Sequence, residues 1–484
     1  MPFRCPPRCW SPTGFCLAAA AATALFLAGC SGVPNAAFLK RRYSHESVQF
    51  RSAWGPIPQQ TSKAILAELK QESGADGIVQ RQTAIEQVVA GHPLVTGNRV
   101  QLLLDGPATY QAMFAALRQA KQTINVESYI IDDRELGQKF AAILLERRAA
   151  GVEVNVIYDY IGSLKTKNEF FDRLRAGGIH VLVFNPVKLR TATRPWKLNH
   201  RDHRKLTVID GRIAFLGGIN IDEVYAHSST SSGGGSSGSG GSGGSSSSSK
   251  EAEIRSGWRD TDVEIEGPVV ADFQRLFLKN WKEHDGTPLD EAKYLPLLAP
   301  VGTDIVRAIG SSPKDAYSVI YLSLMAAIIN AQHSVYITNA YFVPDPQFIQ
   351  ALVDAAHRGV DVRLVLPSTT DSKSAAYAAH SYYAKLLNGG VKIYERQSAL
   401  LHAKTAVIDG VWSMVGSANL DWRSAVDNDE LDAVILSQDF AKKMIRTYAF
   451  DESQSDLIDP AQWKHRPFRD RVKETVFRLV GRLL

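Results

Sequence analysis

A histidine followed two residues later by a lysine occurs twice in this chain, each time at the start of the same longer pattern. Counting from the histidine, both copies place Lys at +2, Asp at +7, Gly at +14, a small residue at +15 and Asn at +17. The first copy consists of His203, Lys205, Asp210, Gly217, Gly218 and Asn220, and the second of His402, Lys404, Asp409, Gly416, Ser417 and Asn419. Repetition of the whole pattern predicts two copies of one functional unit.

These residue types suit the transfer of a phosphodiester. Such a group carries one negative charge, so fixed cations and amide donors must surround its non-bridging oxygens. The groups of this kind in the two copies are Lys205, Lys404, Asn220 and Asn419. Displacing an alkoxide also needs two imidazoles, one that attacks phosphorus and one that protonates the leaving oxygen. Each copy supplies one histidine, so we expect both copies to face one substrate.

Each histidine begins a stretch with the composition of a β-strand, HRKLTVID or HAKTAVID. Residues i and i+2 of a strand share a face, so each histidine and its lysine should point the same way. The Asp at +7 stands before a Gly between two apolar runs, which is a strong hairpin signal. We therefore interpret Asp210 and Asp409 as turn residues rather than as participants in the chemistry.

The paired HxKx4Dx6G[GS]xN motifs resemble those of the phospholipase D superfamily. The segments YFVPD, RGVDVRLVLP, LHAKTAVIDG, VGSANLDWRS and WRDTDVEIEGP further resemble its bacterial cardiolipin synthase branch, and the resemblance covers about residues 98–484. It implies a phosphohistidine intermediate, no metal and no other cofactor. It also implies an acidic residue downstream of each motif that holds its histidine, and the matching positions are Asp260 in WRD and Glu430 in NDE.

The order of the motifs suggests which histidine does what. The first histidine is usually the nucleophile in this superfamily, so the resemblance implies attack by His203 and acid–base work by His402. The reverse assignment is the alternative.

The chain around the motifs also looks duplicated. TINVESYIID and SVYITNAYFVPD follow predicted helices, and each is followed by a helix, a second strand, a helix ending in Gly-Gly and another strand. This alternation predicts an α/β fold with a mainly parallel sheet covered on both faces. We expect two tandem α-β-α sandwich domains, residues 98–290 and 291–450, related by a pseudo-twofold axis that brings both motif strands to one shared cleft.

The first thirty residues resemble the leader of a bacterial lipoprotein. Arg4 and Arg8 precede the apolar run FCLAAAAATALFLA, which is too short to span a bilayer comfortably, and LAGC ending at Cys30 resembles a lipobox. We expect a signal peptide over residues 1–29 and a diacylglycerol anchor on Cys30. An ordinary signal peptide or an uncleaved anchor is the alternative.

The lipobox reading has consequences for location and for redox chemistry. Ser31, rather than Asp, follows the cysteine, which favours the periplasmic leaflet of the outer membrane. All four cysteines lie in the first thirty residues, so the mature domain has no disulfide and no cysteine metal site. Residues 30–97 are then a lipidated tether and lead-in.

Two further segments stand apart in composition. Residues 228–249 consist of Ser and Gly apart from Thr230 and predict a flexible loop. Residues 451–484 end in a basic amphipathic helix that either lies on a membrane surface or docks on its own domain.

A few other residues are weaker candidates for chemistry. Glu127, Tyr129, Asn339 and Tyr341 fall on predicted strands and are candidates for the lining of the cleft. Asp421 and Arg423 are candidates for a local ion pair. His200 and His203 are spaced like a metal pair, but no second pair of ligands accompanies them.

Together these features predict an envelope lipoprotein that transfers a phosphatidyl group between phospholipids, as a cardiolipin synthase does. With water as acceptor, the same site would be a phospholipase D that releases phosphatidic acid. A nuclease or other phosphodiesterase and a non-catalytic envelope scaffold are the rival classes. The formal net charge falls from +5 to +3 when Arg4 and Arg8 leave with the leader, so we expect no nucleic-acid partner. We expect a phospholipid substrate and a monomer.

Overall fold

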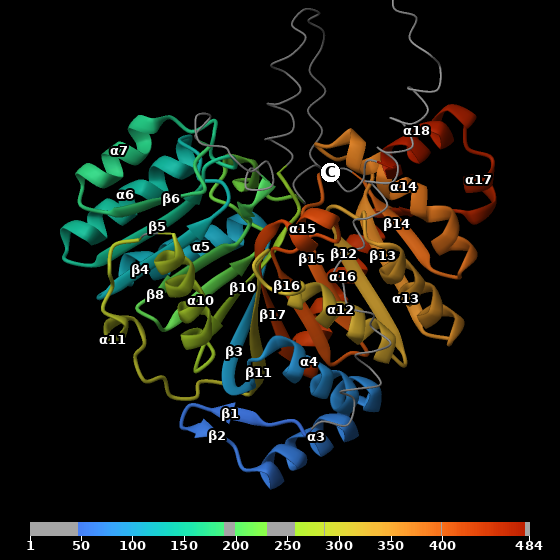
Figure 1. The fold of residues 1–484 in the computed structure, drawn as a ribbon, viewed down its shortest axis with the longest axis horizontal. Helices are drawn as coiled ribbons and strands as arrows, with labels where there is room; N and C mark the ends of the chain where they lie inside the picture. The colour runs from blue at the N-terminus through green and yellow to red at the C-terminus, as the bar shows by residue number, and fades with distance from the viewer. Residues whose placement is uncertain (1–46, 188–198, 230–256, 285, 398, 480–484) are drawn as a thin grey trace, which may run out of the picture. The chain divides into compact units, whose positions relative to one another are not determined.

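The computed structural model describes residues 47–187, 199–229, 257–284, 286–397 and 399–479 (Figure 1). The predicted signal peptide, the predicted lipidation site at Cys30 and all but the first two residues of the Ser/Gly-rich segment lie outside the described residues. Within the described ranges, every helix is too short or too polar to cross a membrane. All described residues belong to one compact unit, Asn35–Leu484.

The first half of the chain builds one mixed sheet around its motif. Its strands, in spatial order, are β6 (His180–Phe184), β5 (Glu153–Asp159), β4 (Thr123–Ser128), β8 (Lys205–Ile209), β9 (Ile213–Gly217), β10 (Thr261–Glu266) and β3 (Leu94–Leu104). The strands β4, β5 and β6 are parallel, and the other neighbours are antiparallel.

The second half repeats this order and these directions. Its strands are β14 (Lys392–Arg396), β13 (Asp361–Pro367), β12 (Ser334–Asn339), β15 (Lys404–Ile408), β16 (Trp412–Gly416), β17 (Asn428–Leu436) and β11 (Asp304–Ser311). An antiparallel pairing between β3 and β11 joins the two sheets at their edges. This is the two-part α/β architecture that the alternating strands and helices predicted.

The expectation of mainly parallel sheets was wrong. In each half only three strands are parallel, because each motif folds as an antiparallel hairpin, β8–β9 or β15–β16, and the next strand returns beside it. The short connection within each hairpin permits only antiparallel pairing, whereas parallel strands need a crossover.

Helices cover both faces of the sheets. In the first half, α5 (Asp105–Gln119), α6 (Glu135–Ala149) and α7 (Asn168–Ala176) enclose one hydrophobic core with β4 and β5. The second half carries α12 (Val319–Asn330), α13 (Pro346–His357) and α14 (Lys373–Asn388) in the corresponding chain positions. A central core contains side chains of both sheets together with α10 (Val270–Glu283) and α16 (Gln438–Ser453). This shared apolar core holds the halves together.

The described part of the predicted lead-in is folded. It forms β1 (Phe50–Ser52), β2 (Gly55–Pro56), α3 (Gln59–Ser73), the π-helix η1 (Gly77–Gln82) and α4 (Thr83–Ala90). The elements η1 and α4 pack on α12, and β1 extends the sheet beside β3. Glu86 of α4 forms a fully buried ion pair of 3.1 Å with Arg307 of β11. The lead-in is thus tied to the second sheet.

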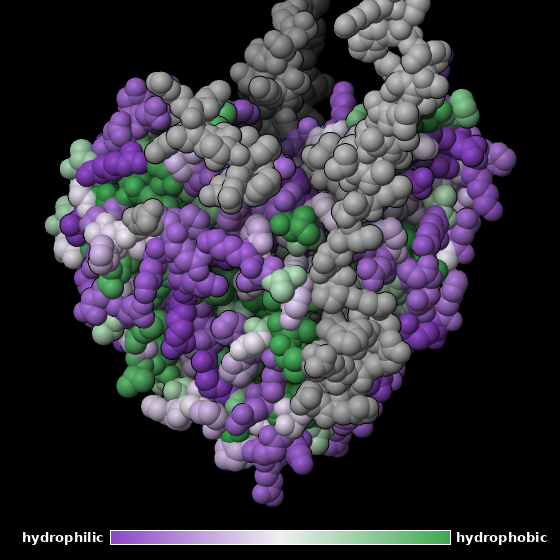
Figure 2. All heavy atoms as spheres, in the orientation of Figure 1, coloured by the Kyte–Doolittle hydropathy of each residue, from purple (hydrophilic) through white to green (hydrophobic). Residues whose placement is uncertain are grey.

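The C-terminal segment forms β18 (Ser455–Leu457), α17 (Pro460–Lys464) and α18 (Phe468–Leu479). The helix α18 packs on α14, where the rings of Phe477 and Tyr377 stack with their centroids 5.6 Å apart. Its opposite face leaves four large apolar side chains exposed, namely Phe468, Val472, Val476 and Leu479. Elsewhere, the face drawn in Figure 2 carries hydrophobic patches interrupted by hydrophilic residues. The helix therefore docks on its own domain and still presents an apolar surface.

Candidate active site

A cavity of about 310 Å³ is lined by residues of both motifs. His203 and Asn220 of the first copy and His402 and Asn419 of the second all face it. The two lysines lie behind the histidines, and the Nζ atom of each donates a hydrogen bond to the backbone carbonyl of its own histidine. The structure thus brings the His and Asn of the two motifs together around one cavity, while neither lysine is among the residues that line it.

Backbone pairing between the halves fixes both histidines. The short strand β7 (Arg201–Asp202) runs parallel to the start of β17, and His203 N donates to the carbonyl of Asp429 at 2.9 Å. In the symmetric arrangement, His402 N donates to the carbonyl of Arg259 at 2.8 Å. Each histidine is therefore held next to the acidic residue of the other half.

The acid partners are crossed. Glu430 Oε2 lies 3.0 Å from Nδ1 of His203, and Asp260 Oδ2 lies 2.8 Å from Nδ1 of His402. The expectation that each acid holds the histidine of its own motif was wrong. The reason is that each acid stands at the beginning of the strand after its hairpin, where that strand meets the opposite half.

The crossed carboxylates orient the imidazoles. A carboxylate accepts the proton on Nδ1, which leaves Nε2 with its lone pair as the nitrogen available to a substrate. Burial, together with the cations of Lys205 and Lys404 and against the opposing effect of Glu430, lowers the pKa of His203 to about 4. Burial, with Lys404, lowers the pKa of His402 as well. Both rings are therefore neutral at neutral pH, as a nucleophile or base requires.

The two histidines differ in what surrounds them. Tyr129 approaches His203 edge-on, with ring centroids 5.1 Å apart. His402 lies against Tyr225 and Trp258, whose ring centroids are 5.9 and 5.3 Å away, and the Tyr225 hydroxyl is 3.0 Å from its Nδ1. The Nζ atom of Lys404 is also 2.8 Å from that nitrogen. The two imidazoles therefore have different surroundings, as expected if they have different roles in the reaction.

The lysines carry shifted pKa values because they are buried. Burial lowers the pKa of Lys205 to about 7 and that of Lys404 to about 8, while Glu430 and Asp260 oppose the shift. Two ammonium groups so close to one another favour an anion in the site. A phosphodiester beside them would add to the effect of Glu430 and Asp260 and favour the charged form of both lysines.

The carboxylates of Glu430 and Asp260 are fixed by further contacts within their own halves. Glu430 accepts hydrogen bonds from the hydroxyls of Ser417 at 2.5 Å and Ser424 at 2.7 Å. Asp260 accepts one from the backbone of Thr261 at 2.7 Å, and a Cβ placed on Gly218 would lie only 2.2 Å from its Oδ1. The small residue at +15 of each motif therefore leaves room for the acid or binds it.

The aspartates at +7 occupy the hairpin turns. Asp210 and Asp409 have positive φ angles of 52° and 51°. Their carboxylates accept backbone N–H groups from residues 121–123 and 332–334, where β4 and β12 begin. Neither aspartate lines the cavity. Their geometry is that of turn residues that anchor the hairpins to the sheets.

The asparagines present amide groups to the cavity. Asn220 Oδ1 accepts the backbone N–H of Ile130 at 3.1 Å, which leaves its NH₂ group on the other side of the amide. The assigned Oδ1 of Asn419 is buried without a hydrogen-bond partner among the described residues. An amide oxygen in this position gains a partner only from a group that donates a hydrogen bond.

Only some of the weaker candidates from the sequence line the cavity. Tyr129, Tyr341, Asp421 and Arg423 line the cavity, whereas Glu127 and Asn339 do not. Asp421 caps the N-terminus of α15 (Trp422–Val426) by accepting Ser424 N at 2.8 Å, and the structure gives no ion pair between Asp421 and Arg423 in the described residues.

His200, three residues before His203, contacts an acidic residue of the second half. His200 Nε2 lies 2.8 Å from Asp429 Oδ2. The described residues contain no group of three or more His, Cys, Asp or Glu side chains positioned to hold a metal ion.

Sequence reasoning missed Arg201, Tyr225 and Trp258, which also line the cavity. Arg201 is two residues before His203 on an extended segment, so the rule that residues i and i+2 share a face was the signal that would have found it. The positions of Tyr225 and Trp258 carried no such signal, because they flank the long Ser/Gly-rich segment.

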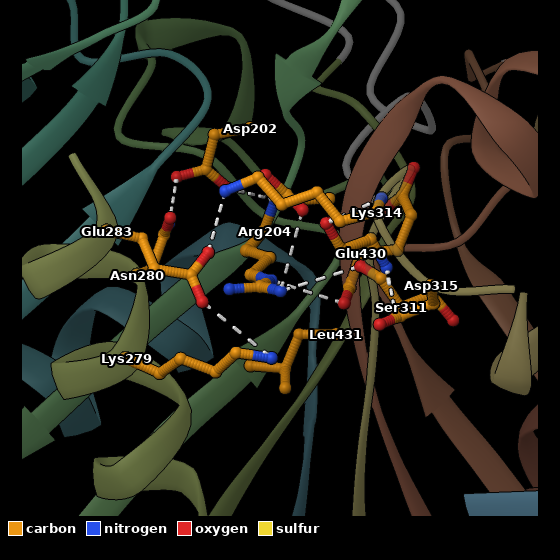
Figure 3. Close-up of polar contacts among 12 residues, drawn as sticks. Asp202, Arg204, Lys279, Asn280, Glu283, Ser311, Lys314, Asp315, Glu430 and Leu431 are labelled. Carbon is orange, nitrogen blue, oxygen red and sulfur yellow. Dashed lines mark hydrogen bonds and ion pairs between the residues drawn. The ribbon is translucent and has the colours of Figure 1, made fainter.

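A buried polar cluster around Arg204 joins the halves (Figure 3). Arg204 donates to the backbone carbonyls of Glu430 at 3.3 Å and Ser311 at 3.5 Å. Beside it, the amide of Asn280 donates to Asp202 Oδ2 at 3.1 Å. Burial raises the pKa of Asp202 well above its ordinary value. Arg204 thus fixes the backbone of the residue whose side chain holds His203.

Comparison with known proteins gives a consistent result. A family model described as "Cardiolipin synthase, PLD-like domain" matches residues 113–229 and 324–451. The cardiolipin synthase of Geobacillus kaustophilus is 35% identical, over 82% of this chain and 74% of the relative. The major cardiolipin synthase of Bacillus subtilis is 32% identical, over 82% of this chain and 78% of the relative.

A solved structure shares the fold. The phosphatidylserine synthase of Haemophilus influenzae aligns with a TM-score of 0.61 at 13% identity, over 82% of this chain and 99% of that one. At that identity the likeness concerns the arrangement of the chain.

Proposed function

The chain belongs to the cardiolipin synthase family with phospholipase D-like domains and is a phosphatidyltransferase, and we propose that it forms cardiolipin from two phosphatidylglycerol molecules. The observation that carries this proposal is the pair of buried histidines, each oriented by a carboxylate of the other half and both facing one cavity. Two oriented imidazoles at one phosphodiester are what a double displacement needs.

In the first step, His203 Nε2 attacks the phosphorus of the donor. The new P–N bond forms as the bond from phosphorus to the glycerol oxygen breaks, and His402 gives its Nε2 proton to that oxygen. The negative charge of the bound phosphodiester favours the protonated form of His402, and Asp260 stabilises that form. Glycerol leaves, and the phosphatidyl group remains on His203.

In the second step, the terminal hydroxyl of another phosphatidylglycerol attacks the phosphorus. Its proton passes to His402, the P–O bond forms and the P–N bond to His203 breaks. The product is cardiolipin, and His402 is again protonated for the next cycle. Lys205, Lys404, Asn220 and Asn419 stabilise the charge on the non-bridging oxygens in both steps. Asp260 and Glu430 are positioning residues, because they act through the imidazoles.

Water in place of the second lipid would turn the same site into a phospholipase D. Family membership supports the synthase, and the aromatic side chains around His402 favour it because they restrict water at the acid–base group. A nuclease is disfavoured by the modest formal charge of +5 for the full chain.

For location, we propose that the chain is a monomeric lipoprotein anchored through Cys30 in the periplasmic leaflet of the outer membrane. The LAGC sequence and the Ser after it support this placement. The exposed apolar face of α18 lies among basic residues and would rest on the bilayer. Such a contact would keep the cavity close to its lipid substrates.

The experiment is to incubate the purified protein with phosphatidylglycerol vesicles in chelator-containing buffer and to resolve the lipid products and free glycerol. Cardiolipin and glycerol in equal amounts support the proposal. Phosphatidic acid as the sole product would make the protein a phospholipase D. Unchanged lipid, together with cleavage of a plasmid, would replace the proposal with the nuclease.

A further inference from the structure

Two arginines that the mechanism above does not use line the same cavity as the histidines. Arg201 belongs to the first half and Arg423 to the second, so they reproduce the two-sided arrangement of the motif residues. A guanidinium group binds phosphate with several N–H donors at once. Two guanidinium groups at one cavity supply N–H donors for a second anion beside the motif residues.

Of the two arginines, Arg201 gives the stronger evidence because it is buried, with only 1% of its surface exposed. Its Nη1 atom lies 3.5 Å from Asp159 Oδ1 and 3.3 Å from the carbonyl of Asn185, whereas Nε and Nη2 are buried without a hydrogen-bond partner among the described residues. Unpaired donors on a buried cation are unfavourable, and an oxyanion in the cavity would satisfy them.

The carboxylate next to Arg201 is already engaged. Asp159 accepts backbone N–H groups from Ile161 at 2.8 Å, Gly162 at 3.0 Å and Asp202 at 3.0 Å. It forms a long ion pair with Arg201 at 3.5 Å, through Nη1 alone. This pair leaves the Nε and Nη2 donors of Arg201 for another anion.

The carboxylates near Arg423 are also engaged elsewhere. Asp421 caps α15 through Ser424 N, and Asp371 accepts the hydroxyl proton of Tyr341. Both acids line the cavity, yet the structure gives Arg423 no ion pair with either of them in the described ranges. Arg423 is half-buried and can turn to an anion without breaking such a pair.

The spacing fits a ligand with two phosphates. Arg201 and His203 are two residues apart on an extended segment, which separates their Cα atoms by about 6.6 Å on the same side. The phosphorus under attack lies at His203. A three-carbon glycerol bridge from that phosphorus would bring a second phosphate to the neighbourhood of Arg201.

We propose that Arg201 and Arg423 bind the phosphate of the acceptor phospholipid while the motif residues bind the phosphate of the donor. This inference rests on the proposed phosphatidyl transfer. The acceptor's hydroxyl oxygen then forms its bond to phosphorus as the bond from phosphorus to His203 breaks, and the hydroxyl proton moves to His402. Water and simple alcohols have no phosphate, so this second site selects phosphatidylglycerol as the acceptor over them.

The test is a competition for one intermediate. Phosphatidylglycerol vesicles supply the donor, ethanol is added as an acceptor without charge, and the ratio of cardiolipin to phosphatidylethanol is measured. Both products arise from the same phosphatidyl-enzyme, so a change in the first step does not affect their ratio. Arg201→Gln should lower the ratio about tenfold or more, and Arg423→Gln about threefold or more, as expected from loss of charged hydrogen bonds.

Controls separate binding from structure. Arg201→Lys keeps the charge but loses the fork of donors, so its ratio should fall between those of the wild type and Arg201→Gln. Arg118→Gln, an exposed position on α5, should leave the ratio unchanged. If both products fall in parallel in Arg201→Gln and Arg423→Gln, with constant ratio, the second site does not exist.

Two further outcomes separate a failure of this inference from a failure of the proposed function. Should Arg201→Gln fail to fold by circular dichroism, an unchanged ratio in Arg423→Gln overturns the inference. A wild type that forms neither cardiolipin nor phosphatidylethanol would instead refute the proposed transferase function on which the inference rests.

Discussion

The carboxylate of Asp260 lies 2.8 Å from Nδ1 of His402, although 142 positions of sequence separate the two residues. Glu430 and His203 form the matching pair at 3.0 Å across 227 positions. Each half therefore supplies one histidine and orients the histidine of the other. A half of this chain on its own would lack an oriented imidazole, so the site exists only when the halves are assembled.

The crossed pairing predicts which histidine responds to each acid. Asp260→Asn removes a carboxylate that raises the pKa of His402, so this pKa should fall further while His203 is unaffected. Turnover should drop on the order of 100-fold or more, because the imidazole loses its orientation and the stabilisation of its protonated form. NMR of labelled histidine in the variant and in Glu430→Gln measures both rings. A response of His203 to Asp260→Asn would contradict the pairing.

Phosphate binding should weaken as the pH rises through neutrality. The pKa of Lys205 is lowered to about 7 by burial, so its charged form is present below that pH and is lost above it. The dissociation constant of glycerophosphoglycerol, a headgroup without acyl chains, should therefore increase between pH 7 and pH 9. In Lys205→Arg the increase should move to higher pH, because guanidinium stays charged. A dissociation constant that is flat to pH 9 in the wild type would show that Lys205 does not bind the phosphate.

The buried pair of Glu86 and Arg307 should be essential for stability. Arg307→Met leaves the fully buried carboxylate of Glu86 without its cation, which costs about 3–5 kcal/mol. The midpoint of thermal unfolding should fall by several degrees, and Glu86→Gln in the same protein should restore part of it. Lys139→Met removes an exposed partner of Glu135 and is the matched control, with little effect expected. Equal midpoints for the two single variants would contradict a structural role of the lead-in.

The apolar face of α18 should bind membranes. In protein with Cys30→Ser, which carries no lipid anchor, Val472→Ser combined with Val476→Ser should weaken sedimentation with phosphatidylglycerol vesicles about tenfold, because exposed valines lose their burial in the bilayer. Leu457→Ser, at another exposed apolar residue, is the control. Equal vesicle binding by the double variant and the wild type would assign α18 to docking alone.

Much of this architecture could be predicted from local sequence. The apolar, β-branched composition of HRKLTVID and HAKTAVID predicts strands, and the Asp-Gly pairs predict the hairpins, because both properties depend on neighbouring residues. The two-part α/β fold followed from the duplication of these patterns. The direction of the later strands did not follow, since the return of β10 and β17 beside the hairpins depends on tertiary packing.

Less of the active site than of the fold could be predicted from the sequence. Residue types indicated the histidines, lysines and asparagines, but which acid meets which histidine depends on how the halves pack, and no local pattern records that. The side chains of Tyr225 and Trp258 come to His402 from either side of a long segment for the same reason. Arg201 was readable from strand periodicity alone, whereas its unpaired donors become visible only when its neighbours are known.

The division of labour between the histidines can be measured by trapping the intermediate. A phosphatidyl ester of p-nitrophenol, labelled in its acyl chain, has a leaving group that needs no proton, so the His402→Ala variant should still form the covalent intermediate at His203 and resolve it slowly. We expect one equivalent of acid-labile label on His203 in this variant and none in His203→Ala. Label on the protein in His203→Ala, or its absence from both variants, would contradict this expectation.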